Sequence, residues 1–481
     1  MEEKKQVISE DWLSFIIGIF IFVLISGNFL YIDLLGWGFK TKVWTDINEA
    51  FVPVSSKFSS LSPILSIIFV YVFLIVVITF GAKLLGANIR KFILAFTIVY
   101  VISLVCWVLG HYANIAATPD KLEDYGITWS LNLTGEAGYI LALIVGLIVG
   151  NFMPGVQKYM NEAIRPELYI KTAIVIMGAG LGVQAAESVG LASSIIFMGL
   201  CAMLVAYLIF WSVSYYIARK WFKFSKEWAA PLASGISICG VSAAIATGGA
   251  IRARPVVPIM VSSLVVIFAV VELIVLPFLA QSFLYTEPLV SGAWMGLSVK
   301  TDGAAVASGA ITDGLVRAKA LAVEGIKYKE GWVLMTATTV KVFIDIFIGI
   351  WAFILAIIWT TKIDKKNEAD KVQLSEIWER FPKFVIGYIL TFIIFLIICL
   401  GLPNLLEQAK LASAEADVFR KIFFVLTFFT IGVVSNFKKL WQEGIGRLAA
   451  VYLVALFGFI IWVGLLISWL FFAGHKPPVI P

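Results

Sequence analysis

The sequence predicts an all-α polytopic membrane protein with about 13 transmembrane helices. Of its 481 residues, 60% are hydrophobic and 14% are charged, whereas soluble domains have roughly 45–50% and roughly 25%. A soluble fold of this composition would expose large apolar patches, which soluble monomers avoid. The apolar residues also gather in runs of about 20, the length that a helix needs to cross a bilayer. The composition therefore excludes a soluble enzyme and a disordered chain.

The apolar runs can be followed in order along the chain. Pro, Gly or charged residues mark most of the gaps, and tryptophans lie near many of the ends, as in an interfacial belt. The run that starts at Trp12 is too long for a signal-peptide core, so we interpret it as a retained first span. The predicted spans are 12–32, 63–82, 91–110, 134–153, 169–187, 193–218, 229–250, 256–281, 288–312, 331–360, 383–402, 417–436 and 448–473.

The net charge of +6 is explained by the positive-inside rule rather than by nucleic-acid binding. With the N-terminus in the cytoplasm, the loops assigned to the inside hold the larger share of the 37 Lys and Arg residues. An odd number of spans then leaves the C-terminus outside. We expect a multi-pass protein of the cell (inner) membrane that contacts the lipid bilayer and binds no nucleic acid.

The sequence contains no motif for a disulfide framework, a metal site, nucleotide binding or intramembrane catalysis. The four cysteines lie inside apolar runs without a CxxC or Cys/His spacing, so neither a disulfide framework nor a metal site is expected. No phosphate loop is present, and no loop could hold a nucleotide domain. No motif of an intramembrane enzyme is found either. The sequence therefore predicts a protein that is not an enzyme and needs no cofactor, and it leaves secondary transport or a channel.

Five ionisable residues lie deep inside predicted spans, where charge is expensive and indicates function by default. Lys341 and Asp345 are four apart on one helix and can pair directly. They form either a mutually neutralising pair or a pair in which one member exchanges its partner during transport. Glu272 stands alone in an apolar run, so either it is protonated by desolvation or it meets a cation from another helix. Lys300 and Asp302 belong to a polar segment of their own.

That segment, Lys300-Thr301-Asp302-Gly303, predicts an unwound stretch that lines a cavity in the middle of the span 288–312. Residues two apart do not share a helix face, and the preceding residues from Gly292 onward are rich in helix-weakening types. Irregular backbone at membrane depth is tolerated where it lines a cavity or is buried in protein. The alternative is a loop between two shorter helices.

A second polar segment, 234–249, has glycine or serine at nearly every second position. It predicts a broken helix whose free N–H groups near Cys239 and whose positive end meet an anion at mid-membrane. The alternative is close helix packing by small residues, in which Cys239 is a small hydrophobe. The binding residues expected here are Ser237, Cys239, Gly240 and Ser242.

An internal repeat is also indicated. The stretch from Tyr169 to Met177 resembles the stretch from Leu334 to Val342, and five spans separate the seventh span from the twelfth, which ends in a polar Thr430–Asn436. Because five is odd, the second unit would be inverted, which is a plan of secondary transporters with broken helices that cross. The predicted parts are an extension at 1–133 with about three spans, a first five-helix repeat at 134–284 and a second, inverted repeat at 285–475.

At these residues the chain resembles the YeiH-like family of bacterial membrane proteins, for which sulfate export has been suggested. The resemblance runs from about Gly135 to Leu470, and its most specific part is the Ser-Ile-Cys-Gly segment. Its carriers are Gly146-Leu-Ile-Val-Gly-Asn151, Lys171-Thr-Ala-Ile-Val-Ile-Met-Gly178, Ser237-Ile-Cys-Gly-Val-Ser-Ala-Ala244, Gly296-Leu-Ser-Val-Lys-Thr-Asp302 with Ala307-Ser-Gly309, and Thr430-Ile-Gly432 with Lys438-Lys439.

The resemblance implies ten core helices in two inverted five-helix units. This plan is similar to that of the cation/proton antiporter and anion transporter superfamily, and the first three spans look like an addition to it. Most members carry His-Glu where this chain has Lys300-Thr301-Asp302. The difference exchanges a titratable imidazole for a fixed positive charge beside a carboxylate.

We therefore expect a secondary transporter of a small anion, such as sulfate, a sulfonate or a small carboxylate, coupled to H⁺ or Na⁺. Dimerisation is expected only by analogy. One alternative is a monovalent cation/proton antiporter that uses Asp302, and another is a non-transporting membrane scaffold. The anion would be bound by Ser237, Cys239, Gly240, Ser242, Lys300, Thr301, Thr430, Ser435 and Asn436, and the coupling residues would be Asp302, Lys341, Asp345 and Glu272.

Overall fold

A computed structural model describes residues 8–118, 121–131, 133–254, 256–359, 381–435 and 446–480, together with Ile363 and Trp378. These residues form an all-helical protein apart from one small hairpin, in which β1 (Phe39–Thr41) pairs antiparallel with β2 (Phe51–Pro53). The chain folds into two compact units. Unit 1 holds residues 1–192, 321–325 and 383–434, and unit 2 holds 193–320, 326–382 and 435–481.

Nine helices among the described residues are long and apolar enough to cross a membrane, which confirms the polytopic helical class. Four further segments lie outside this set for different reasons. The pair α5 (Ala137–Phe152) and α6 (Pro154–Met160) is bent by 112°. Helix α17 begins with a charged half, and two helices of unit 2 are interrupted. The count of about 13 spans therefore stays a prediction.

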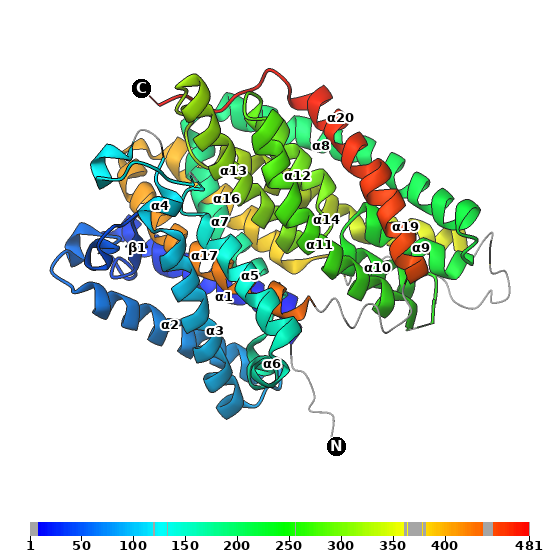
Figure 1. Ribbon diagram of the computed structural model, residues 1–481, viewed down its shortest axis with the longest axis horizontal. Helices are drawn as coiled ribbons and strands as arrows, with labels where there is room; N and C mark the ends of the chain where they lie inside the picture. Colours follow the sequence, from blue (N-terminus) through cyan, green and yellow to red (C-terminus); the bar gives the residue numbers. More distant parts are fainter. Residues whose placement is uncertain are drawn as a thin grey trace. The chain divides into compact units, whose positions relative to one another are not determined.

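Unit 1 is built from long, continuous helices (Figure 1). Their starts follow from local capping, because the Ser9 and Ser62 hydroxyls accept the N–H groups of Trp12 and Leu65 at the first turns of α1 and α2. Besides α5 and α6, the helices are α1 (Glu10–Ile25), α2 (Pro63–Leu84), α3 (Ile89–Gly110), α7 (Pro166–Glu187), α16 (Lys383–Gly401) and α17 (Leu406–Val434).

Glycines let the helices of unit 1 approach each other closely. A Cβ atom on Gly178 of α7 would lie 2.5 Å from the Tyr388 carbonyl oxygen of α16. A Cβ on Gly432 of α17 would lie 2.4 Å from the Leu143 carbonyl oxygen of α5. This backbone-to-backbone contact is the usual way in which membrane helices associate, since lipid offers no hydrophobic force between them.

Unit 2 differs because two of its helices are interrupted in mid-course (Figure 1). The first is the pair α9 (Lys226–Ser237) and α10 (Gly240–Ala250), and the second is the pair α12 (Pro288–Ser298) and α13 (Asp302–Glu324). The uninterrupted helices around them are α8 (Val189–Tyr216), α11 (Val256–Phe283), α14 (Trp332–Ile358), α19 (Gly446–Ala455) and α20 (Ile461–Phe472).

The backbone shows why each helix stops. Ile238 and Cys239 leave the helical region, with φ/ψ of −110/−96° and −134/92°. Val299 is extended at −80/127°, and the Thr301 hydroxyl then accepts the Ala304 N–H and caps the start of α13. Both breaks lie inside segments that the sequence singled out for their glycine, serine and charge.

The compact units are not contiguous in sequence, since unit 1 includes residues 383–434 and unit 2 begins in the middle of the predicted first repeat. They group helices by packing, whereas the predicted repeats at 134–284 and 285–475 group them by chain order. The division into inverted repeats therefore stays a prediction.

Candidate functional site

Five ionisable side chains form what we call the buried charged group of unit 2. Each is between 0 and 2% exposed, so none reaches solvent or lipid. They come from α11, from the break between α12 and α13, and from α14. Burial of so many charges is costly unless they compensate one another. The members are Glu272, Lys300, Asp302, Lys341 and Asp345.

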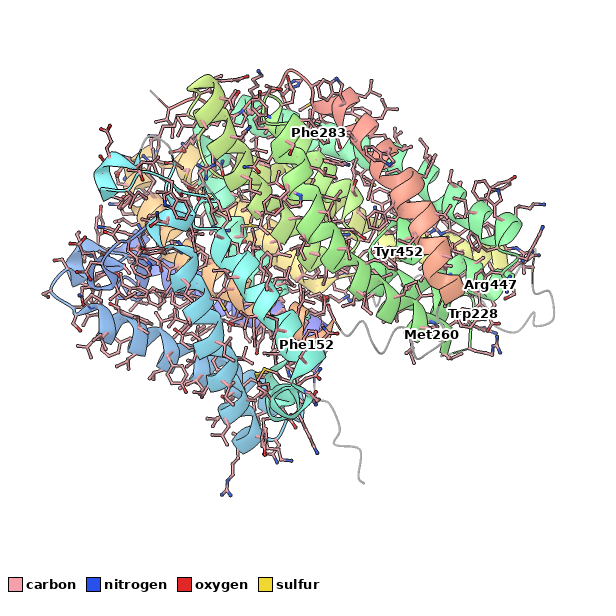
Figure 2. The ribbon with its side chains drawn as sticks, in the orientation of Figure 1. Phe152, Trp228, Met260, Phe283, Arg447 and Tyr452 are labelled. Atoms are coloured by element: carbon pink, nitrogen blue, oxygen red, sulfur yellow. The ribbon has the colours of Figure 1, made fainter. Side chains whose placement is uncertain are left out.

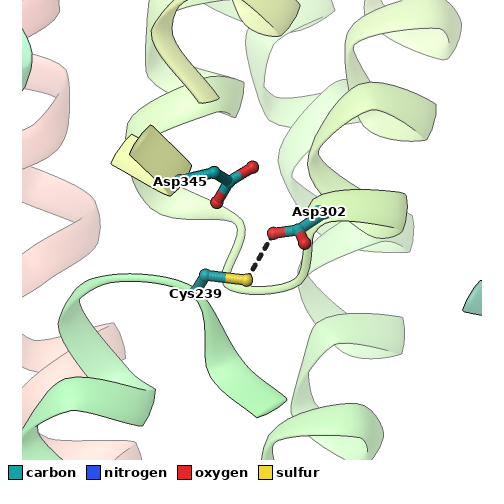
Figure 3. A group of neighbouring side chains, drawn as sticks. All are labelled: Cys239, Asp302 and Asp345. Atoms are coloured by element: carbon teal, nitrogen blue, oxygen red, sulfur yellow. Dashed lines mark hydrogen bonds between the residues drawn. The ribbon is translucent and has the colours of Figure 1, made fainter. Parts of the chain in front are cut away.

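The two helix breaks meet at this group. The Cys239 thiol, in the first break, donates a hydrogen bond to Oδ1 of Asp302, in the second (Figure 3). The next residue, Gly240, packs on the second break so closely that a Cβ atom would lie 2.8 Å from the Lys300 carbonyl oxygen. Glycine is required there because any side chain would push the two breaks apart.

Lys341 joins the two breaks from a third element, α14. Its Nζ lies 3.6 Å from Oδ1 of Asp302 and donates to the Ile238 carbonyl oxygen at 3.2 Å. The sequence predicted Asp345, one turn further along α14, as its partner, and the structure pairs it with Asp302 of α13. Asp345 lies in the same place, with a carboxylate oxygen within 4.8 Å of the Cys239 sulfur and an Asp302 oxygen.

Glu272 of α11 holds the second break from its other side. Its Oε2 accepts the backbone N–H of Lys300 at 2.9 Å, and its Oε1 accepts the hydroxyl of Tyr452 at 3.1 Å. Tyr452 is on α19 (Figure 2). The Lys300 ammonium donates to the Leu297 carbonyl oxygen and lies 4.9 Å from the centroid of the Phe210 ring. Glu272 thus contacts the second break through the backbone amide of Lys300 and α19 through the Tyr452 hydroxyl.

The charges match the helix ends that the breaks create. Each lysine donates to a carbonyl at a C-terminal end, Lys300 at the end of α12 and Lys341 at the end of α9. Asp302 is the first residue of α13 and lies beside the start of α10 through Cys239. A helix carries partial positive charge at its N-terminus and partial negative charge at its C-terminus. The group therefore neutralises four helix ends inside unit 2.

The group nevertheless does not neutralise itself. Three carboxylates and two ammonium groups leave one excess negative charge when all are ionised. An uncompensated charge in a low-dielectric interior is strongly unfavourable. With all five ionised, the group could take up one further positive charge, such as a proton on a carboxylate.

The other predicted binding residues are placed differently. The Ser237 hydroxyl donates to the Ala233 carbonyl oxygen of its own helix, and the Thr301 hydroxyl caps α13. Ser242 is half-buried on α10. Thr430 belongs to unit 1, where its hydroxyl donates to the Leu426 carbonyl oxygen at 2.7 Å. Ser435 is buried directly after the end of α17, and Asn436 lies outside the described residues.

Sequence reasoning missed the aromatic members of the site. Tyr452, Phe210 and Tyr207 all lie in strongly apolar runs, where nothing in the pattern separates a functional ring from a lipid-facing one. Their buried positions become visible only when α8 and α19 are placed around the breaks.

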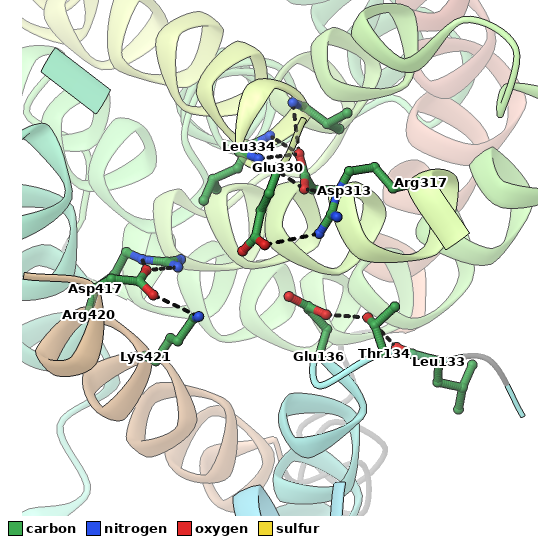
Figure 4. Close-up of polar contacts among 12 residues, drawn as sticks. Leu133, Thr134, Glu136, Asp313, Arg317, Glu330, Leu334, Asp417, Arg420 and Lys421 are labelled. Atoms are coloured by element: carbon green, nitrogen blue, oxygen red, sulfur yellow. Dashed lines mark hydrogen bonds and ion pairs between the residues drawn. The ribbon is translucent and has the colours of Figure 1, made fainter. Parts of the chain in front are cut away.

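Sequence reasoning also missed Asp313 of α13, although it is buried. Its carboxylate accepts the N–H groups of Gly331 at 3.2 Å and Val333 at 3.0 Å and pairs with Arg317 at 2.8 Å (Figure 4). It therefore caps the start of α14. The four-residue spacing between Asp313 and Arg317, directly after the predicted span 288–312, is the signal that could have found it.

Comparisons with known proteins agree on one family. A family model described as "Conserved hypothetical protein 698" matches residues 132–451. A UPF0324 membrane protein of Nitrosomonas europaea is 41% identical over 475 residues, which cover 98% of this chain and 97% of that protein.

Two further relatives are more distant or shorter. A UPF0324 membrane protein of Rhodopirellula baltica is 29% identical over 81% of this chain and 64% of its own length. An uncharacterized protein of Archaeoglobus fulgidus is 51% identical over 163 residues, or 30% of this chain and 87% of that protein. No solved structure matches.

Proposed function

The chain belongs to the UPF0324, or YeiH-like, family of membrane proteins, and we propose that it is a secondary active transporter whose coupling site is the buried charged group of unit 2. One observation carries the proposal: two interrupted helices meet, through Cys239 and Asp302, at five fully buried ionisable residues. Broken helices that place their ends at mid-membrane are the way in which secondary transporters build a site.

A structural role alone explains this group poorly. Replacing buried ion pairs by well-packed apolar residues is often neutral or stabilising, so a scaffold has no need of five buried charges. The helices of unit 1 associate without such a group, through glycines such as Gly178 and Gly432. The cost of the group in unit 2 therefore supports a role in binding.

The charge balance favours a cation, H⁺ or Na⁺, as the coupling ion. Asp302 already occupies the positive end of α13 and lies beside the start of α10, so a substrate anion would compete with this carboxylate. A cation at Asp302 and Asp345 would instead cancel the excess negative charge. Lys341, 3.6 Å from Asp302, would be its internal competitor and would give way when the cation binds.

A small anion is the second candidate cargo, and one observation favours it. The first-turn N–H groups of a helix lack intrahelical partners, and in α10 this turn includes Val241 and Ser242, which are only partly buried. Sulfate, a sulfonate or a small carboxylate could be held there by backbone amides. Lys300 would contribute little, because its ammonium is directed at Leu297 and Phe210.

Reconstituted vesicles test the proposal. Purified protein in proteoliposomes that contain a pH-sensitive dye would be given Na⁺, K⁺, sulfate, a sulfonate or a dicarboxylate in turn. We expect at least one solute to move protons or charge, and we expect Asp302→Asn to abolish this movement. Glu415→Gln is the matched control, because Glu415 is a buried carboxylate of unit 1 that accepts from Asn28 at 2.7 Å.

Two results would contradict the proposal. If no solute moves with the wild-type protein, it is not a transporter of these classes. If Asp302→Asn moves the solute at the wild-type rate, transport does not depend on the buried charged group.

A further inference from the structure

We propose that Cys239, Asp302 and Asp345 form a binding site for a soft divalent metal ion such as Zn²⁺ or Cd²⁺. One ligand atom from each, a sulfur and two carboxylate oxygens, all lie within 4.8 Å of one another, and all three residues are buried (Figure 3). The site goes beyond the proposed function, because a protein can bind a metal here whether or not it transports a solute.

The three ligands come from separate elements that the fold brings to one point. Cys239 caps α10, Asp302 begins α13 and Asp345 lies on α14. A tetrahedral Zn²⁺ with bonds of about 2.0–2.3 Å needs its ligand atoms roughly 3.5 Å apart. Cys239 and Asp302, now in hydrogen-bond contact, would have to separate slightly, and the widest pair, within 4.8 Å, would have to close by about 1 Å. Structural zinc sites use four protein ligands, whereas three protein ligands leave a fourth position open to water or another ligand.

Tyr207 provides an independent indication. Its side chain is 6% exposed, and its hydroxyl has no hydrogen-bond partner among the described residues. Its ring packs against α14, the helix that carries Asp345, with ring centroids 6.3 Å from Phe347 and 5.5 Å from Trp351. Buried polar atoms almost always have a partner, and an orphaned one is unfavourable. A water in the fourth position of a metal bound beside α14 would be a candidate partner for this hydroxyl, which has none among the described residues.

The charges balance when a divalent ion binds. The Cys239 thiol donates to Asp302 and must release its proton to solvent before the sulfur can bind a metal. One thiolate, three carboxylates, two ammonium groups and a divalent cation then sum to zero. Lys341 remains on the Ile238 carbonyl oxygen, its partner at 3.2 Å. The thiolate sets the preference, because sulfur favours Zn²⁺ and Cd²⁺ over Mg²⁺, Ca²⁺ and Na⁺.

Cadmium titration of the purified full-length protein in detergent tests the site. A cadmium–thiolate bond absorbs in the ultraviolet, so we expect this absorption to saturate at one Cd²⁺ per chain in the presence of excess Mg²⁺. Cys239→Ser should abolish it, whereas Cys106→Ser, which changes a buried cysteine of unit 1, should leave it unchanged. Asp345→Asn keeps the sulfur but removes a charged ligand, and should weaken binding by at least about tenfold.

The outcomes separate the metal site from the transporter. Absence of cadmium–thiolate absorption in the wild-type protein, or its full retention in Cys239→Ser, overturns the site. If Cys239→Ser fails to fold, the wild-type stoichiometry and the affinity of Asp345→Asn decide instead, and unchanged affinity there overturns the site. Solute flux is measured separately in metal-free buffer, so loss of transport with intact cadmium binding counts only against the proposed function.

Discussion

The two units use the same small residues for opposite purposes. In unit 1, Gly178 and Gly432 lie inside continuous helices and let neighbouring backbones touch. In unit 2, Gly240 lies at a helix break and lets that break touch a second one. Unit 1 therefore keeps its helices continuous and joins them by close backbone packing, beside polar contacts such as that of Glu415 with Asn28. Unit 2 interrupts two helices and places buried charges at the breaks. Because buried charges are expensive, this difference is what the proposed transport function would explain.

The largest expected effect is the loss of stability when a buried lysine of unit 2, rather than an exposed lysine of unit 1, loses its charge. Lys341→Met should destabilise the protein by about 3–5 kcal/mol, because it leaves the carboxylate of Asp302 buried beside a methyl group. Lys410→Met is the control, since Lys410 of unit 1 is 44% exposed and its ion pairs should be worth at most about 1 kcal/mol. Thermal unfolding of both variants in detergent checks the difference.

A double variant sharpens this test. Lys341→Met with Asp302→Asn removes both charges, so it should regain a large part of the stability lost in Lys341→Met alone. Equal unfolding midpoints for Lys341→Met and Lys410→Met would show that the buried pair does not stabilise unit 2.

The next largest expected effect is the loss of stability when a glycine at a close helix contact of unit 1 gains a methyl group. Gly432→Ala should destabilise unit 1 by about 1–3 kcal/mol, because the added methyl meets the Leu143 carbonyl oxygen at 2.4 Å. The flux per folded molecule should not change, since this contact does not involve the buried charged group. Gly155→Ala of α6 is the matched control, with no atom within 4 Å of the added carbon. A Gly432→Ala protein as stable as Gly155→Ala would contradict the packing argument.

The corresponding change in unit 2 should have a different signature. Gly240→Ala places its methyl 2.8 Å from the Lys300 carbonyl oxygen and forces the two breaks apart. We expect a loss of flux per folded molecule, beyond any loss of stability, when the variant is assayed in proteoliposomes beside Gly432→Ala. Equal flux in the two variants would mean that contact between the breaks is not needed for transport.

The smallest effect concerns a buried carboxylate outside the charged group. Asp313→Asn weakens the cap of α14 and should cost about 1 kcal/mol, as other helix caps do. Its flux per folded molecule should equal that of the wild-type protein. A flux as low as that of Asp302→Asn would show that burial of a carboxylate in unit 2, rather than membership of the buried charged group, determines sensitivity.

The helical class and both interrupted segments could be predicted from the sequence, because apolar length and a cluster of Gly, Ser and charge are local signals. The start of α17 at Leu406 could not, since the charged residues before Val418 hide the first turns from a search for apolar runs. The contact of Lys341 with Asp302 could not be predicted either, because sequence spacing identifies only neighbours on the same helix.

The proposed metal site and the two buried tyrosines could not be predicted either, because their residues are far apart in the sequence and meet only in the fold. Cys239, Asp302 and Asp345 show no ligand spacing along the chain and meet only through the crossing of two breaks with α14. Tyr452 and Tyr207 lie in apolar runs, where the sequence does not distinguish a buried ring at a site from a ring that faces lipid. The predicted involvement of Thr430 and Asn436, the division into inverted repeats, and the direction of each terminus stay predictions.

Charge movement in reconstituted membranes shows whether the buried charged group couples ions to transport. Electrical recording from proteoliposomes on a solid support would compare the wild-type protein, Asp302→Asn and Glu415→Gln after a jump in pH, Na⁺ or sulfate concentration. We expect a transient current for the wild-type protein and Glu415→Gln, and none for Asp302→Asn. A current of wild-type size from Asp302→Asn would contradict the proposed function.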